Sequence, residues 1–467
     1  MTVATATPEV RAGETTAPWL AEHERFLRGL PAGDPAAGDP AADEPAPLHA
    51  LRQLGIERFA ALGFPTLRQE EWRFTNVAPI ARGSFVRPSQ ETEVDPARLT
   101  PHDFEAVARL VFVDGRFSEK LSQVGALPAG TVVSGLAQAL AKTPELVLAH
   151  LGQHARIGGH RDHPFVALNT AFLQDGAFVH VPRGAVVEGT VHLLFLSSGP
   201  AEGAGTPTFS FPRNLIVAGE NSQVTVVETY AGEGAYFCCP VTELFSGPSA
   251  VVDHYKLQRE SRDAFHIATF QIEGERGSAP SSHSISIGGG LVRNDVNAVL
   301  AGEGIDCILN GLYLAEGRQL IDNHMRVEHA SPHCGSPELY KGILDGKARA
   351  VFNGLIHVHP GAQKTDAKQS NRNLLLSSEA IANSNPQLEI FADDVKCTHG
   401  STVGQLDEDA IFYLRSRGIG AEAASSLLTY AFASDIVERI KVEPVRRDLE
   451  EFLFARLPQG EVVRQAV

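Results

Sequence analysis

The 467-residue chain lacks any run of 18 apolar residues, so we expect no transmembrane helix. Its first residues lack a basic stretch followed by an apolar block, so no secretory signal is predicted. The five cysteines are few and odd in number, which argues against a disulfide framework. We therefore expect a cytoplasmic protein in a reducing compartment.

Basic residues are also scarce, since 40 Lys and Arg stand against 56 Asp and Glu, a net charge of −16. This balance argues against binding to nucleic acid or to an anionic membrane surface. The chain contains no phosphate-binding G-x-x-x-x-G-K-[ST], no G-x-G-x-x-G opening a helix, no G-x-S-x-G and no H-E-x-x-H. The corresponding nucleotide-binding proteins, hydrolases and zinc proteases are not expected.

The periodicity of the apolar residues changes twice along the chain. Helical spacing near both ends flanks a long region of short alternating strands separated by Gly, Asn, Asp or Pro. A Pro/Ala/Asp-rich stretch at 31–47 predicts a flexible linker, and 109–117 predicts a hairpin around Asp114 and Gly115. The predicted domains are a flexible N-terminal segment at 1–48, an α/β helical region at 49–163, a β core at 164–411 and a helical C-terminal domain at 412–467.

The β core is too long for an ordinary sandwich, and it has no helices between its strands. We therefore predict a right-handed parallel β-helix, of roughly ten coils at about 25 residues each. An internal echo supports a repeat, because Asn310–Gly311 and Asn353–Gly354 occur in similar contexts. The predicted fold class is mainly β, with helical N-terminal and C-terminal regions.

Cysteine and histidine are the residues with the most chemical potential. Cys238 and Cys239 are adjacent, so on a strand they point to opposite faces and cannot chelate together. Burial is the favoured interpretation for this pair. Cys334 follows His333 in a turn-like stretch, where metal binding is an open but weaker alternative.

A second group lies near the end of the β region. His357 and His359 share a face on a strand, and they are either two imidazoles for one metal or part of an exposed polar face. In FADDVKCTHGSTVG, residues 391–404, Cys397 and His399 also share a face if the strand is regular. A thiolate and an imidazole suit iron, zinc or iron–sulfur chemistry. Two ligands do not complete a site, so a site shared with a second chain and a purely buried pair both remain open.

Residues 383–424, NSNPQLEIFADDVKCTHGSTVGQLDEDAIFYLRSRGIGAEAA, closely resemble the C-terminal signature of the SufB/SufD family of iron–sulfur cluster assembly proteins. Similar stretches occur at 63–76, 167–195 and 371–380, so the resemblance runs from about residue 50 to the end. The D-D-V-K-C-x-H-G form is SufD-like, and the Glu-His-Glu pattern of SufB-like chains is absent.

This resemblance implies a parallel β-helix with helical ends and a non-enzymatic scaffold that supports iron acquisition. The expected partners are a SufB-like subunit at the β-helix edge and a SufC-like ABC-type ATPase at the C-terminal helices. A homodimer is one possible form of the isolated chain, and its oligomeric state stays open. No tightly bound cofactor is expected in the chain alone, and iron or an iron–sulfur cluster is expected transiently in the complex.

By carry-over from the family motif, His399 is the expected ligand for iron or the nascent cluster, with Cys397 in a supporting role. The expected ATPase-docking residues lie on the C-terminal helices: Tyr413, Arg415, Arg417, Leu428 and Phe432.

Two alternatives come from other functional classes. One is a β-helix polysaccharide lyase or hydrolase, which leaves the helical C-terminus unexplained. The other is a purely structural interaction protein without a metal role.

Overall fold

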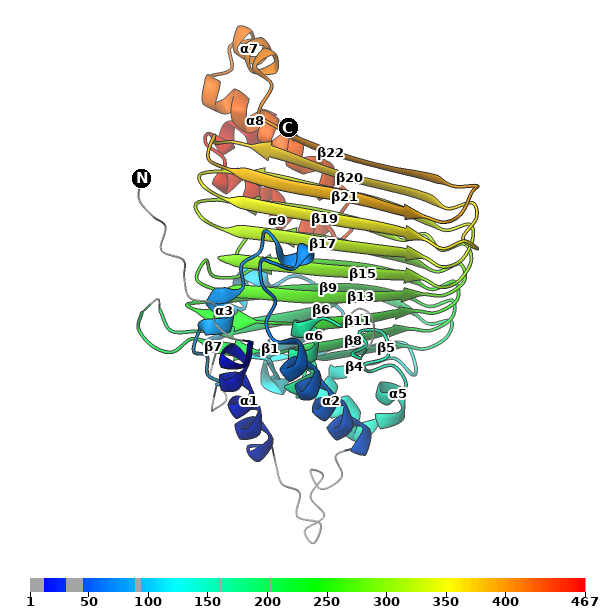
Figure 1. Cartoon of the computed structure of the whole chain (residues 1–467). Helices are drawn as coiled ribbons and strands as arrows, with labels where there is room; N and C mark the ends of the chain where they lie inside the picture. Colours follow the sequence, from blue (N-terminus) through cyan, green and yellow to red (C-terminus); the bar gives the residue numbers. More distant parts are fainter. Residues whose placement is uncertain (1–11, 31–44, 89–93, 159–161, 202, 467) are drawn as a thin grey trace.

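The computed structural model describes residues 12–30, 45–88, 94–158, 162–201 and 203–466. Two long, mostly parallel sheets stack strand upon strand into a β-solenoid of about seven turns, with helices at both ends of the chain (Figure 1). The prediction of a mainly β chain with a parallel β-helix core and helical ends is confirmed. Most of the predicted linker at 31–47 lies outside the described residues.

The first sheet runs from the first strands of the chain, β1 and β2, to its last strand, β22. Its order is β2 (Arg116–Phe117), β1 (Ala108–Val113), β6 (Val186–Ser198), β9 (Gln223–Glu233), β12 (Val251–Arg259), β14 (Ala279–Ser286), β16 (Ile308–Ala315), β18 (Gly335–Leu344), β20 (Asp366–Leu375) and β22 (Lys396–Gly404), with β3 (Gln123–Val124) beside β1. The expected hairpin is confirmed, because β1 and β2 pair in antiparallel orientation. Strand β1 also pairs in parallel with β6, so residues before 164 extend the solenoid sheet.

The second sheet supplies the other half of each coil. Its order is β21 (Ile381–Ile390), β19 (Arg349–Val358), β17 (Leu320–His329), β15 (Leu291–Leu300), β13 (Phe265–Gly274), β11 (Val241–Ser246), β8 (Arg213–Ala218), β5 (Ala177–Val181) and β4 (Val132–Gly135), with β7 (Thr208–Ser210) and β10 (Tyr236–Cys238) off this path. The alternate side chains that point between the sheets form the largest apolar cluster of the protein.

Each coil is longer than the sequence suggested. Successive strands of the second sheet begin at Phe265, Leu291, Leu320, Arg349 and Ile381, so a coil takes about 29 residues. The estimate of ten coils was therefore too high, because it assumed shorter turns between the strands.

The Asn-Gly echo does not mark equivalent positions of two coils. Asn310 and Gly311 lie on β16 in the first sheet, whereas Asn353 and Gly354 lie on β19 in the second. The two glycines nevertheless share a role. A Cβ at Gly311 would lie 2.3 Å from the Tyr340 ring, and one at Gly354 would lie 2.3 Å from Nε2 of Gln369. Both glycines therefore make room for a large side chain of a neighbouring coil.

The N-terminal helices cover the early coils of the second sheet. They are α1 (Ala12–Arg28), α2 (Ala46–Leu62), α3 (Ala78–Arg82), α4 (Leu136–Lys142), α5 (Pro144–Leu148) and α6 (Pro164–Ala171). Trp19, Phe26 and Phe59 pack there against Phe237 and Ile267 of the sheet. The helical spacing predicted near the N-terminal end is confirmed by α1 and α2.

A buried ion pair holds this helical region on the solenoid. The fully buried Arg213 lies 2.6 Å from Oε1 of Glu243, measured from Nη2. Glu243 also accepts hydrogen bonds from the backbone amides of Gly152, His154 and Ala155. Because the Glu243 carboxylate accepts from both a strand and a loop, the two parts are fixed to one another.

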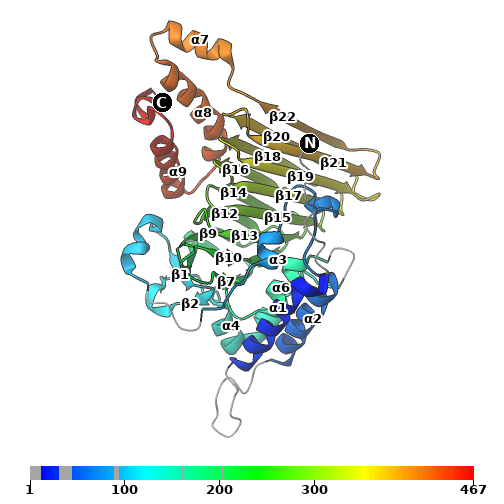
Figure 2. The same ribbon diagram turned by 60° about the vertical axis from the view of Figure 1, so that its left-hand side comes forward.

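Two of the C-terminal helices, α8 (Ala421–Val437) and α9 (Glu443–Arg456), pack on the outer face of the first sheet (Figure 2). Helix α7 (Glu408–Ser416) has no buried residue, and α10 (Gly460–Ala466) packs on α8 and α9. Ile436, Val437 and Ile440 contact a row of apolar residues that includes Tyr255 and Ile343. No helix among the described residues combines the length and apolarity that crossing a membrane requires.

Candidate functional site

The solenoid ends in two open strands. Strands β21 and β22 are the last of their sheets, and no other described strand pairs with their outer edges. The side chains of β22 are mostly exposed and those of β21 are half-buried or exposed. Exposed apolar residues on or next to the two strands are Ile381, Ile390, Phe391 and Val403. An edge of this kind offers free backbone donors and acceptors to another chain.

Cys397 and His399 lie on β22, in the last coil. This strand pairs with β20 without a break from Lys396 to Gly404, so the two side chains share a face, as a regular strand requires. The His399 imidazole is exposed and makes no hydrogen bond or ion pair with any described residue. It is therefore available to a ligand or a partner.

The Cys397 thiol lies further in than His399. It is half-buried in a small apolar cluster with Ala367 and Ala392. Burial raises the pKa of Cys397, and a backbone hydrogen bond with Ala367 opposes this only in part. Metal or another cation is needed to ionise this thiol at neutral pH.

The neighbouring aspartates do not converge on Cys397 and His399. Asp394 forms an ion pair with Lys364, and its backbone amide donates to Oε1 of Gln363 at 2.9 Å. Asp393 is exposed. The close spacing of these residues in the sequence therefore does not produce a four-ligand site.

The H-x-H motif lies beside this end of the solenoid, but each imidazole already has a carboxylate partner. Nδ1 of His357 lies 2.8 Å from Oε2 of Glu389, and Nε2 of His359 lies 2.7 Å from Oε1 of Glu328. The His357 ring also contacts Phe391, with centroids 5.4 Å apart. Of the two interpretations, the geometry favours the polar surface.

His333 and Cys334 point apart. His333 has a left-handed backbone with φ of 60° and an exposed side chain, whereas Cys334 is buried and donates to the Gly302 carbonyl at 3.2 Å. They do not form a joint site.

Two residues beneath His399 were not predicted from the sequence. Strand register places Gln369 directly opposite His399 and Glu338 directly opposite Gln369. Both lower residues are buried, and Nε2 of Gln369 donates to Oε2 of Glu338 at 3.0 Å. Burial raises the pKa of Glu338 to about 8. His399, Gln369 and Glu338 are therefore stacked at equivalent positions of three successive coils. The buried carboxyl group of Glu338 holds its proton at neutral pH. Only the coil period, about 30 residues here, could have revealed this stacking from sequence.

Helix α7 extends beyond β22, at the top of Figure 1. It carries exposed Phe412 and Tyr413, and Nη2 of Arg417 donates to the Tyr413 hydroxyl at 3.2 Å. Arg415 is exposed as well. A polar and aromatic surface is thus available on α7.

The two docking candidates on α8 are less accessible. Leu428 is half-buried. Phe432 packs on the apolar cluster of the first sheet, with Nζ of Lys341 4.7 Å from its ring centroid. Part of the apolar face of this helix therefore covers the solenoid.

Comparison with known proteins gives consistent matches over most of the chain. Residues 200–432 match the model of the SufBD core domain of the SUF system for FeS cluster assembly, and residues 41–193 match the model of the SufBD N-terminal region. An iron–sulfur cluster assembly SufBD family protein of Synechocystis is 34% identical over 417 residues, 87% of this chain and 90% of that protein. The iron–sulfur cluster assembly protein SufD of Escherichia coli is 31% identical over 420 residues, 87% of this chain and 93% of that protein. The SufD protein of Bacillus subtilis is 29% identical over 300 residues, 62% of this chain and 65% of that protein.

Proposed function

Because this chain belongs to the SufB/SufD family of iron–sulfur cluster assembly proteins, as a SufD-like member, we propose that it is a non-catalytic scaffold subunit of a SufBCD-type complex. In this proposal the cytoplasmic complex acquires iron and forms a nascent cluster where this chain meets a SufB-like subunit. The cluster is the cargo of the complex, and the isolated chain does not retain it.

The observation that carries the proposal is the open last coil. Its edge strands pair with no other described strand on their outer sides, and together with the exposed apolar residues they suit pairing with a strand of a related solenoid. The SufB-like subunit is the proposed occupant in the complex, and a second copy of this chain takes its place when the chain is isolated. His399 lies on this edge, so a partner seated there would meet its imidazole.

We assign the two candidate ligands different roles. The exposed His399 binds iron or passes a proton during cluster formation, because its ring nitrogens have no partner among the described residues. Cys397 supports it from a half-buried position on the same face of β22. The remaining ligands come from the partner, since the described neighbours do not complete a site.

The SufC-like ATPase is proposed to dock on the C-terminal helices. Tyr413, Arg415 and Arg417 on and after α7 are exposed and form the centre of this surface, with Leu428 and Phe432 at its margin. ATP hydrolysis by the partner would then move α7 relative to the edge strand that it follows.

The test uses co-expression of this chain with its SufB-like and SufC-like neighbours, followed by purification and iron and sulfide analysis. His399→Ala should leave the complex intact and lower its cluster content, because the exposed ring has no structural contact among the described residues. Ser401→Ala is the matched control, since Ser401 is exposed on the same face of the same strand. Full cluster content in His399→Ala would refute the site, and failure of the wild-type chain to join the complex would refute the scaffold role.

A further inference from the structure

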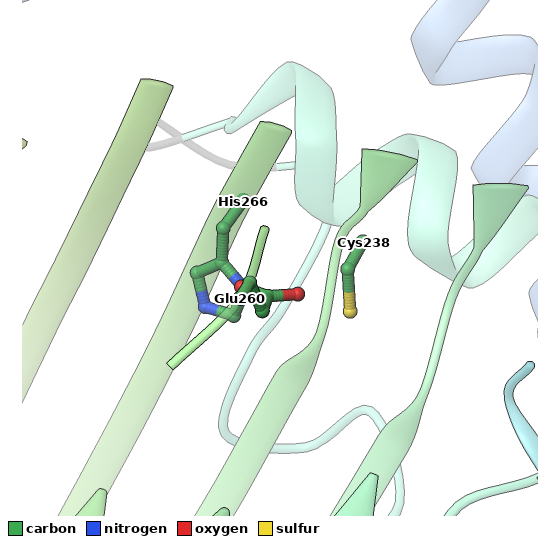
Figure 3. Close-up of side chains that lie close together, drawn as sticks. All are labelled: Cys238, Glu260 and His266. Carbon is green, nitrogen blue, oxygen red and sulfur yellow. The ribbon is translucent and has the colours of Figure 1, made fainter. Parts of the chain in front are cut away.

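A second group of potential ligands lies deep inside the solenoid, away from the last coil. Cys238 ends the short strand β10, His266 lies near the start of β13, and Glu260 lies in the loop between β12 and β13 (Figure 3). Their exposed fractions are 1%, 0% and 4%. Strand register pairs Cys238 directly with His266, so the two side chains point to the same side.

The three side chains converge on one point. One ligand atom from each lies within 4.8 Å of the other two, and no other described residues place three such atoms so close. Nδ1 of His266 lies 2.7 Å from Oε2 of Glu260. Two ligands of a tetrahedral Zn²⁺ ion lie roughly 3.3–3.8 Å apart. The His266–Glu260 contact is shorter than this and the 4.8 Å limit is longer, so an ion requires small shifts of the three side chains.

The group is also incompletely satisfied. Oε1 of Glu260 and Nε2 of His266 are buried and have no hydrogen-bond partner among the described residues. The other oxygen of Glu260 accepts from Nε2 of Gln258 at 3.0 Å. Since Nδ1 of His266 faces Oε2 of Glu260, Nε2 is the ring nitrogen that is left for an ion. Unpartnered buried polar atoms are costly, which points to an absent ligand.

We propose that Cys238, Glu260 and His266 bind one divalent cation, Zn²⁺ or Fe²⁺, inside the solenoid. A thiolate, an imidazole and a carboxylate form a mixed donor set that suits these ions. On binding, the Cys238 thiol loses its proton to solvent, and the thiolate and the carboxylate together balance the two charges of the ion. A neutral centre can be buried at lower cost than a charged one.

The residues around the three ligands allow Cys238 to move and can supply a fourth ligand. Strand β10 has only three residues and pairs with β7 and β13 off the main path of its sheet, so Cys238 can move towards an ion. Tyr236 lies two residues before Cys238 on β10, and its buried hydroxyl has no hydrogen-bond partner among the described residues. Its oxygen, or a water molecule, is available for a fourth position.

One neighbour opposes the ion. Lys256 is buried near Glu260 and Cys238, and its ammonium donates to Oδ1 of Asn294 at 2.7 Å. The same charge favours the thiolate of Cys238. Because the thiolate and the carboxylate balance the charge of the ion, the net repulsion from Lys256 is small.

The experiment measures metal in the full chain, expressed in medium with added Zn²⁺ and, separately, with Co²⁺ as a spectroscopic probe. We expect one ion per chain and a thiolate-to-cobalt charge-transfer band. Cys238→Ser should abolish the band, and His266→Gln should weaken metal affinity by more than the roughly 10–100-fold that loss of an outer hydrogen-bond partner costs. Cys239→Ser is the matched control, because Cys239 is equally buried but faces a different apolar cluster.

Two results would overturn the inference. One is a wild-type chain that carries no ion, or carries cobalt without the thiolate band, and this outcome does not depend on the folding of any variant. The other is an ion that persists in Cys238→Ser but disappears in His399→Ala, which would place the metal at the edge of the solenoid. The interior cation site does not depend on the proposed function. Retention of the ion in His399→Ala would therefore support the interior site without testing the role of His399 in cluster assembly.

Discussion

Replacing Glu338 with glutamine removes a buried carboxyl group two coils below the open edge. Burial raises its pKa from 4.5 to about 8, and the hydrogen bond from Gln369 opposes this only in part. The other ionisable groups near it are the buried Cys307 and Tyr340, whose pKa values are raised by burial and then by Glu338 itself. No basic group is among the causes of the shift, so the charged carboxylate would be poorly compensated.

The sign of the effect follows from proton binding. Below pH 4.5 the carboxyl is protonated in both the folded and the unfolded chain, and the folded state is not penalised. As the pH rises from 4.5 to 8, the unfolded chain releases the proton that the folded chain retains, so the stability of the wild type falls. At 1.36 kcal/mol per pKa unit, the full loss is ~5 kcal/mol above pH 8.

Glutamine keeps the shape and the acceptor oxygen but does not titrate. We therefore expect the free energy of unfolding of Glu338→Gln, relative to that of the wild type, to increase by ~5 kcal/mol between pH 4 and pH 9. Urea unfolding of both proteins across this range measures the difference. The surface substitution Glu188→Gln is the control and should show no such gain. Parallel stability curves for wild type and Glu338→Gln would refute the claim that a protonated carboxyl lies beneath Gln369.

Three further substitutions test the packing that positions the site. Gly354→Ala should displace Gln369 from the interior and destabilise the last coils by about 1–3 kcal/mol, measured by thermal unfolding, and an unchanged midpoint would contradict the close contact. Glu243→Gln should cost about 3–5 kcal/mol in urea unfolding and speed amide exchange in the loop it holds, because the buried Arg213 loses its charged partner; slow exchange in this loop would count against the argument. Lys341→Met should make α8 more sensitive to protease, because the Lys341 ammonium contacts Asp435 and a backbone carbonyl of that helix. The strand signal in circular dichroism should persist. Equal cleavage rates for variant and wild type would show that the apolar contacts alone hold α8 on the sheet.

Local patterns predicted much of the architecture. Alternation of apolar and polar residues with a period of two identifies strands, and the absence of helical periodicity between them favours a solenoid. Both patterns are local, so they can be recognised without knowledge of tertiary contacts. The terminal helices and the Asp114–Gly115 hairpin were predicted for the same reason. The shared face of Cys397 and His399 also follows from the geometry of one strand.

Stacking between coils could not be predicted in this way. The Asn-Gly echo placed Asn310 and Asn353 as apparent equivalents, yet they lie on different sheets, because the coil length sets the register and varies along the rod. The same uncertainty concealed Glu338 and Gln369 beneath His399.

The sequence by itself determined the elements, the faces of the single strands and, through its long C-terminal motif, the family resemblance. Only the tertiary structure decided which side chains meet: His399 at an open edge, and Cys238 beside His266 and Glu260 in the interior. The physical reason is that alternation is a property of one strand, whereas contacts across coils depend on the length of every turn between them.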